Sequence, residues 1–169
     1  MEFQEIKTLS AVLYMSLIRE ASLSDIEELF GIRSTVPELY MGDDSPQAER
    51  KRWEDDVSIG RGCCLVYERN DEIVGFIWAQ HLEEDGKLIG RIRYLYVDTE
   101  HRRGGIASKL YESCEARLRE KFYVKIRSGT APDNFAIHRM CEKYGFHFLG
   151  IKRSGDKDNP LAFYEKDLQ

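Results

Sequence analysis

The residues of this chain most able to do chemistry are two adjacent arginines followed by two adjacent glycines. Arg102, Arg103, Gly104 and Gly105 follow an apolar, strand-like run and precede a stretch whose apolar residues recur at one-turn spacing. The first turn of such a helix has backbone N–H groups without intrahelical partners, together with the partial positive charge of the helix dipole. Glycines let a ligand approach the backbone, and the arginines add full positive charge. The stretch therefore predicts a pocket for phosphate or diphosphate.

Three kinds of phosphate-binding loop join a strand to a helix in this way. A Walker loop needs the string G-x-x-x-x-G-K-S/T, which the chain does not contain. A dinucleotide fingerprint needs G-x-G-x-x-G, which residues 104–109 do not supply. The third pattern, R/Q-x-x-G-x-G/A, is matched at every defined position from Arg102 to Ala107, although Arg103-Gly104 reverses the usual order of the middle pair. This stretch resembles the pyrophosphate loop of the GNAT N-acetyltransferase superfamily; the alternative is an ordinary basic helix N-terminus after a glycine-rich turn.

Two further stretches resemble signatures of the same superfamily. One signature has the form N-x-x-A-x-x-x-Y-x-x-x-G-F, and here Asn134 is followed by an apolar helical face and then by Gly145-Phe146. The family start, I-R-x-A-x-x-x-D, has a counterpart from Ile18 to Asp25. Three matches in the right order, covering about residues 15–169, identify the chain as a member of the GNAT superfamily.

The composition limits the class of protein. A chain of 169 residues with 42% hydrophobic and 33% charged residues is typical of one globular domain. A net charge of −5 argues against a nucleic-acid partner, and no apolar run is long enough to span a bilayer. Glu2 and Glu5 stand where a secretory leader would be basic, and the four cysteines show no metal-ligand spacing. We therefore expect a reduced, cytoplasmic protein without a metal.

The pattern of apolar residues, glycines and prolines divides the chain into short elements. Strands are predicted at 17–20, 63–68, 72–81, 88–97, 122–127, 146–151 and 161–165, and helices at 26–33, 47–57, 104–121 and 134–144. Ser24 or Asp25 is expected to cap the first helix, and Asp133 the last. This order predicts an α/β (α+β) domain with a mixed, mostly antiparallel central sheet of six to seven strands flanked by about four helices, which matches the GNAT fold.

The start of the domain is expected near Met15. This methionine stands just before the family-like beginning, so residues 1–14 are either an N-terminal extension or an over-called start. Residues 15–169 are then a single N-acetyltransferase domain.

The resemblance implies acetyl-CoA as co-substrate and no metal. In the superfamily the pantetheine arm inserts between the fourth and fifth strands, and a backbone N–H near Leu95 would donate to the thioester oxygen. Asn134 is expected to contact the coenzyme, to cap its helix, or to do both. The expected cofactor-binding residues are Leu95, Tyr96, Val97, Arg102, Arg103, Gly104, Gly105, Ile106, Ala107, Ser108 and Asn134.

The catalytic residues are less defined, because the chain departs from the family pattern. The position of the family tyrosine, which protonates the leaving thiolate, holds Cys141, while Tyr144 lies three residues further on. Cys141 could donate the proton, Tyr144 could substitute, or water could suffice because a thiolate is a tolerable leaving group. A nucleophilic role for Cys141, paired with His138, is unspecific without a third partner.

The general base is equally open. The strand-four positions where many relatives carry a carboxylate hold Arg93 and Tyr94, which leaves His81 or Glu83 acting through water. Arg91 and Arg93 share one strand face and would favour an anionic acceptor if that face looks into the cleft; the alternative is an ion-paired face. The acidic and aromatic region 36–58 would suit a cationic amine, but a solvated surface explains it as well.

The predicted function is transfer of an acetyl group from acetyl-CoA to a primary amine by direct attack in a ternary complex. The acceptor is a small-molecule or peptide amine, with no nucleic-acid or membrane partner. The oligomeric state is left open between a monomer and a homodimer, although dimers are frequent in the superfamily. The alternative is a non-catalytic acyl-CoA-binding regulatory module, suggested by the missing tyrosine and the missing carboxylate.

Overall fold

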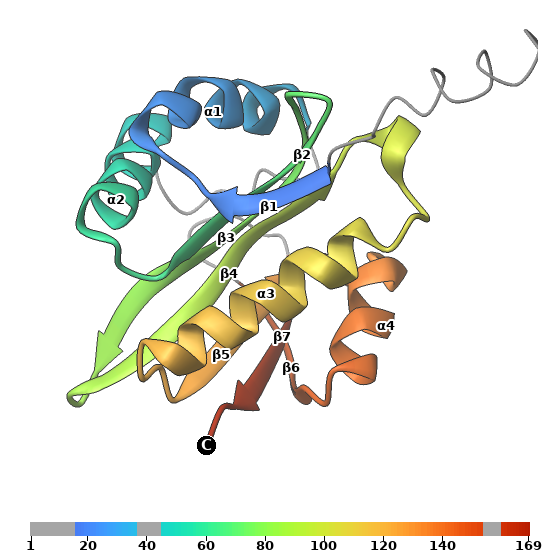
Figure 1. Ribbon diagram of the computed structural model, residues 1–169. Helices are drawn as coiled ribbons and strands as arrows, with labels where there is room; N and C mark the ends of the chain where they lie inside the picture. The colour runs from blue at the N-terminus through green and yellow to red at the C-terminus, as the bar shows by residue number, and fades with distance from the viewer. Residues whose placement is uncertain (1–15, 37–44, 154–159) are drawn as a thin grey trace, which may run out of the picture.

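A seven-stranded sheet in the order β1-β2-β3-β4-β5-β7-β6 forms the centre of the protein (Figure 1). The computed structural model describes residues 16–36, 45–153 and 160–169. All neighbouring strands are antiparallel except β4 and β5, which are parallel. The strands are β1 (Ser16–Glu20), β2 (Cys63–Arg69), β3 (Glu72–Glu84), β4 (Lys87–Val97), β5 (Lys125–Thr130), β6 (His147–Arg153) and β7 (Pro160–Asp167). The mixed, mostly antiparallel sheet predicted from the sequence is confirmed.

Four α-helices cover the two faces of this sheet. They are α1 (Ile26–Thr35), α2 (Pro46–Ile59), α3 (Ile106–Glu120) and α4 (Phe135–Lys143). Figure 1 shows α1 and α2 on one side, and α3 and α4 on the other. Within the described segments, no helix is long and apolar enough to cross a membrane. The expected extension at residues 1–14 lies outside the described residues, as do residues 37–44 and 154–159.

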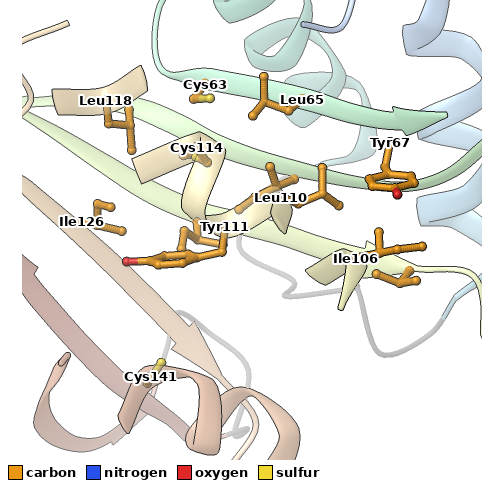
Figure 2. Packing of buried hydrophobic residues seen from close by; sticks show 14 of the residues in the cluster. Cys63, Leu65, Tyr67, Ile106, Leu110, Tyr111, Cys114, Leu118, Ile126 and Cys141 are labelled. Carbon is orange, nitrogen blue, oxygen red and sulfur yellow. The ribbon is translucent and has the colours of Figure 1, made fainter. Parts of the chain in front are cut away.

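The larger core lies between the sheet and α3. Ile106, Leu110, Cys114 and Leu118 recur at four-residue spacing, and each is at most 2% exposed. Figure 2 shows this row of side chains packed against residues of β2, among them Leu65. Burial of each large apolar side chain contributes about 1.5–3 kcal/mol. The helix predicted from periodicity is therefore held to the sheet by the face that the pattern identified.

A glycine lets α3 approach the sheet closely. A Cβ at Gly90 on β4 would lie only 2.8 Å from Cδ1 of Leu118. We expect Gly90→Ala to destabilise the fold by about 1–3 kcal/mol, because Leu118 must shift within a packed core. Urea unfolding measures the change.

The matched control is Gly31→Ala in α1, where a Cβ would meet nothing within 4 Å. This change is expected to stabilise the helix by up to about 1 kcal/mol. Equal free energies of unfolding for the two variants would contradict the close packing at Gly90.

The hairpins β2–β3 and β3–β4 each close through a two-residue turn. Asn70 and Asp71 have φ of 53° and 63°, and Asp85 and Gly86 have φ of 50° and 72°. Two consecutive positive φ angles are typical of type I′ turns, whose twist suits two-residue hairpins. These turns set the pairing of β2 with β3 and of β3 with β4.

The cap predictions for α1 and α4 are confirmed in part. Asp25 occupies the N-cap position of α1, as one of the two expected alternatives. Neither Ser24 nor Asp25 caps α1 through its side chain. The Asp25 carboxylate instead accepts from the Ser22 backbone N–H at 2.7 Å and from the Arg19 guanidinium at 2.7 and 3.0 Å, which lowers the pKa of Asp25 to about 2. The cap of α4 is Asn134, whose Oδ1 accepts from the Ile137 N–H at 3.4 Å, so the expectation that Asn134 caps its helix is confirmed and the one for Asp133 is wrong. Polar side chains at a helix start have several acceptable partners, and packing selects among them.

One strand boundary also differs. The strand predicted at 122–127 is β5, and it begins three residues later, at Lys125. Phe122 has a φ of 63° and is 83% exposed, so it ends α3 in a left-handed turn instead of starting a strand.

Candidate active site

The strands β4 and β5 are paired over only part of their length and then diverge. They pair only over Ile89–Ile92 and Lys125–Ser128. A register shift in the pairing with β3 leaves Arg93 as an extra residue between Ile92 and Tyr94. A bulge of this kind bends a strand. The end of β4 therefore has β3 on one side, while its other edge is left unpaired in the described structure.

A cleft of about 1010 Å³ opens where the two strands diverge. Its walls come from the end of β4, the loop into α3, the first turn of α3, the loop after β5, one face of α4 and the end of α1. Ten of the eleven predicted cofactor-binding residues line it: Leu95, Tyr96, Val97, Arg102, Arg103, Gly105, Ile106, Ala107, Ser108 and Asn134. Gly104 is exposed in the same loop and does not line the cleft.

The first turn of α3 faces this cleft, and no side chain caps it. Gly105 is the N-cap residue, with a φ of 78° and no side chain to accept a hydrogen bond. The first backbone bond of the helix runs from Lys109 N–H to the Gly105 carbonyl, at 3.0 Å. The N–H groups of residues 106–108 are therefore not used by the helix, and no acidic residue occupies its first turn. This arrangement suits an external anion.

The arginines of the loop have different roles. Arg102 donates through Nε to the Val97 carbonyl at 2.9 Å, which ties the loop to the end of β4. Arg103 has a φ of 65° and an exposed side chain at the cleft. A non-glycine residue in this conformation is uncommon, and such residues cluster at functional sites.

Two basic residues at the cleft were not predicted from the sequence as site residues. Arg139 and Lys143 line it from α4, and the Lys143 ammonium donates to Ser108 Oγ at 3.3 Å. Their spacing of four residues places them on one helix face, and this spacing could have indicated a shared basic surface. Which face of α4 would look towards the loop could not be known from the spacing alone.

The structure does not bring the three predicted catalytic residues into the cleft. Cys141 is fully buried in the core beneath α4. The Tyr144 hydroxyl donates to Glu112 Oε1 at 2.7 Å, and its ring packs on Tyr111 with centroids 4.3 Å apart. His81 lies near the other end of β3, where Nδ1 is 2.7 Å from the Tyr123 hydroxyl. None of the three is among the residues that line the cleft.

Burial also sets the protonation state of Cys141. Desolvation raises the pKa of its thiol to about 12, so the thiolate is not accessible at neutral pH. We expect Cys141→Ala to keep kcat within about threefold, which is less than 1 kcal/mol of barrier, while lowering the melting temperature through a small cavity. Steady-state kinetics and thermal unfolding measure both effects. A loss of kcat by two orders of magnitude in a folded variant would instead place this thiol in the reaction.

The α1–α2 side of the sheet holds a buried polar cluster at the bulge. Glu49, in the predominantly polar helix α2, is only 2% exposed. Its carboxylate lies 2.5 Å from Nη2 of Arg33 and 3.7 Å from Nη2 of Arg93, and it accepts from the Tyr94 hydroxyl. Arg93 is thus ion-paired, the second of the two alternatives for this strand face. The cluster ties α1 and α2 to the bulged residue that opens the cleft.

Within residues 16–36, 45–153 and 160–169, no group of three or more His, Cys, Asp or Glu side chains is arranged to hold a metal ion.

Comparison with known proteins places this geometry in context. A model of the acetyltransferase (GNAT) family matches residues 26–146. An N-acetyltransferase from Staphylococcus aureus has a TM-score of 0.73 and 24% identity over 92% of this chain and 99% of its own. A ribosomal-protein-alanine N-acetyltransferase from Brucella melitensis has a TM-score of 0.71 and 22% identity, over 89% and 99%. A putative acetyltransferase from Salmonella typhimurium, solved with its cofactor acetyl-CoA, has a TM-score of 0.72 and 18% identity, over 92% and 95%.

Proposed function

Because the chain belongs to the acetyltransferase (GNAT) family, we propose that it transfers an acetyl group from acetyl-CoA to a primary amine by direct attack in a ternary complex. The observation that carries this proposal is the cleft between the diverging ends of β4 and β5, which ends at the uncapped first turn of α3. A relative in fold was solved with acetyl-CoA, which supports the choice of co-substrate. The sheet from Ser16 to Asp167 and the family match support a single domain over residues 15–169.

The diphosphate of the coenzyme is assigned to the start of α3. The free N–H groups of residues 106–108 donate to its oxygens, and Arg103 adds a full charge from the loop. Fixed amides suit this task because they need no reorganisation when the anion arrives.

The pantetheine arm and the thioester are assigned to the unpaired edge of β4. Backbone groups along residues 93–97 lack a β5 partner, so an extended ligand can bond to them as an added strand. A backbone N–H at or next to Leu95 would then donate to the thioester oxygen as negative charge develops on it. The cleft continues to Tyr96, Thr35 and Val36, where the amine would approach.

The reaction needs a neutral amine and a proton for the leaving thiolate. The amine nitrogen bonds to the carbonyl carbon, the carbon–sulfur bond breaks, and the nitrogen loses a proton to water. Since neither Cys141 nor Tyr144 lines the cleft, we assign protonation of the thiolate to water as well. A coenzyme thiolate is stable enough to leave without a positioned acid.

A panel of primary amines tests the proposal. Polyamines, aminoglycosides, free amino acids and peptides with N-terminal alanine or methionine are incubated with acetyl-CoA, and thiol release is followed. Release with at least one class supports acetyl transfer and identifies the acceptor. Tight coenzyme binding without release across the panel favours the regulatory acyl-CoA-binding module, and absence of binding in calorimetry overturns both.

A further inference from the structure

The buried carboxylate of Glu49 contacts two consecutive residues of β4. It lies 3.7 Å from Nη2 of Arg93, and it accepts from the Tyr94 hydroxyl. Consecutive residues of a regular strand point to opposite faces of the sheet, so they do not normally reach the same carboxylate. Arg93 and Tyr94 do so at the position where Arg93 is the extra residue of the bulge. The double contact with Glu49 therefore favours the bulged form of β4 over a regular strand.

The same carboxylate is held from α1 as well. Nη2 of Arg33 lies 2.5 Å from Oε2 of Glu49, and Nε of Arg33 donates to the Tyr94 hydroxyl oxygen at 3.3 Å. All four residues of this cluster, Arg33, Glu49, Arg93 and Tyr94, are buried. Hydrogen bonds and ion pairs are stronger in such surroundings than in water. A shift of β4 relative to α1 and α2 would weaken several of them at once, so the cluster fixes the position of the bulge.

The bulge stands directly before the backbone that we assign to the thioester. Leu95 follows Tyr94, and the peptide unit between them carries the Leu95 N–H. On one edge this part of β4 pairs with β3, while on the other edge the pairing with β5 ends at Ile92. Within the described residues, the direction of this peptide unit therefore depends on β3 and on the Glu49 cluster. A hydrogen-bond donor that stabilises a transition state must be held within about 0.5 Å of its productive position.

We propose that Glu49 is a positioning residue for acetyl transfer. By holding Arg93 and Tyr94 at the bulge, it aims the backbone N–H at or next to Leu95 at the thioester oxygen. Glu49 acts through β4, because it is not among the residues that line the cleft. The inference rests on the proposed function, since it assumes that the thioester lies along the unpaired edge of β4. It gives the buried ion-pair cluster an effect on the reaction in addition to its effect on stability.

Infrared difference spectroscopy of bound acetyl-CoA, labelled with ¹³C at the thioester carbonyl, tests the proposal. A hydrogen bond to the carbonyl oxygen weakens the C=O bond, so the band of acetyl-CoA bound to the parent chain is expected at lower wavenumber than that of free acetyl-CoA. Glu49→Gln keeps the size of the side chain but not its charge, and here the band should return most of the way to the free position. With an amine that the parent chain acetylates, kcat should fall at least about tenfold while the KM for acetyl-CoA stays within about threefold, because the misaligned N–H contributes most in the transition state.

An apolar variant separates positioning from stability. Arg33→Met/Glu49→Leu/Arg93→Met replaces all three charged side chains of the cluster, and such replacements of buried ion pairs often preserve or raise stability. The melting temperature is expected at or above that of Glu49→Gln, while the carbonyl band and kcat stay at the values of Glu49→Gln. A return of both to the parent values would show that the cluster is only structural, and would overturn the inference.

Tyr94→Phe provides a milder test that keeps every charge of the cluster. It removes only the hydroxyl that donates to Glu49, so the band should move part of the way and kcat should fall about threefold. Tyr111→Phe is the matched control, because it takes a 2.5 Å bond to Glu115 from another buried tyrosine, on α3, and should leave the band and kcat unchanged. Equal effects of the two substitutions would contradict a specific role for the Glu49 cluster.

Glu54→Gln is the control for Glu49→Gln. It removes a carboxylate from the same helix, where Glu54 pairs with Arg50 at the surface, and should change neither the band nor kcat. A carbonyl band that is the same in Glu49→Gln as in the parent chain, or a parent band at the position of free acetyl-CoA, overturns the inference and leaves the proposed function standing. Failure of the parent chain to bind acetyl-CoA in calorimetry overturns the proposed function itself.

Discussion

Ser108→Glu is expected to weaken coenzyme A binding by at least about 30-fold, or 2 kcal/mol, without destabilising the fold. Ser108 is the third residue of α3 and lines the cleft. A carboxylate there meets the free N–H groups and the positive end of the helix dipole, as an acid in a first turn normally does. It therefore takes the place of the diphosphate and repels it. Calorimetry measures the affinity, and thermal unfolding measures the stability.

Ser108→Glu is expected to keep or raise the stability while it lowers the coenzyme affinity, and this combination makes the prediction specific. A helix start with an acidic first turn gains about 0.3–1 kcal/mol, so the melting temperature should stay level or rise while the coenzyme affinity falls. Ser108→Gln is the matched control, because it has nearly the same shape without the charge and should bind within about fivefold of the parent. If the glutamate variant binds coenzyme A as tightly as the glutamine variant, the diphosphate does not lie on this turn.

Glu49→Ala is expected to lower the free energy of unfolding by about 3–5 kcal/mol. The carboxylate is buried, and both Arg33 and Arg93 approach it, at 2.5 and 3.7 Å. Its removal withdraws the anion from two buried guanidinium groups, whose exposures are 6% and 8%, and takes an acceptor from the Tyr94 hydroxyl. Removing one partner of a buried ion pair is among the most destabilising single changes. Urea denaturation followed by circular dichroism measures the loss.

A surface glutamate in the same helix provides the control. Glu54 pairs with Arg50 at 2.9 Å, with both side chains 38% exposed, so Glu54→Ala should cost no more than about 0.5 kcal/mol. Glu49→Gln is expected to fall between the two, because it keeps the volume and one acceptor but not the charge. A cost below about 1 kcal/mol for Glu49→Ala would show that the cluster does not hold α1 and α2 to the bulge.

The cofactor loop could be predicted well because its function depends on local backbone conformation. Gly105 permits the left-handed turn before α3, and the residues that follow show the periodicity of a helix that packs on a sheet. The left-handed turn and the helical periodicity each depend on only a short run of consecutive residues. The phosphate pocket, the strand before it and the helix after it therefore followed from one short stretch, and the structure places nearly all of its predicted residues at one cleft.

The bulge in β4 and the buried glutamate could not be predicted in this way. Arg93 and Tyr94 interrupt the alternation of the strand, but an interruption alone does not show which neighbour accommodates it. Glu49 shares a helix face with Trp53 and Asp56, and two of these three buried residues are acids, so the apolar pattern that marks a core face is nearly absent. Their burial depends on partners from α1 and β4, which are far away in the sequence.

The sequence by itself determined the order of the elements, the core face of α3 and the position of the phosphate loop, because each follows from spacing within one element. Only the tertiary structure decided that Cys141 faces the core, that Tyr144 bonds to α3, that His81 lies away from the cleft, and that Arg139 and Lys143 face the loop. Spacing shows which residues share a face of a helix or strand. What that face meets is set by packing against elements distant in the sequence, and no single stretch of the chain carries that information.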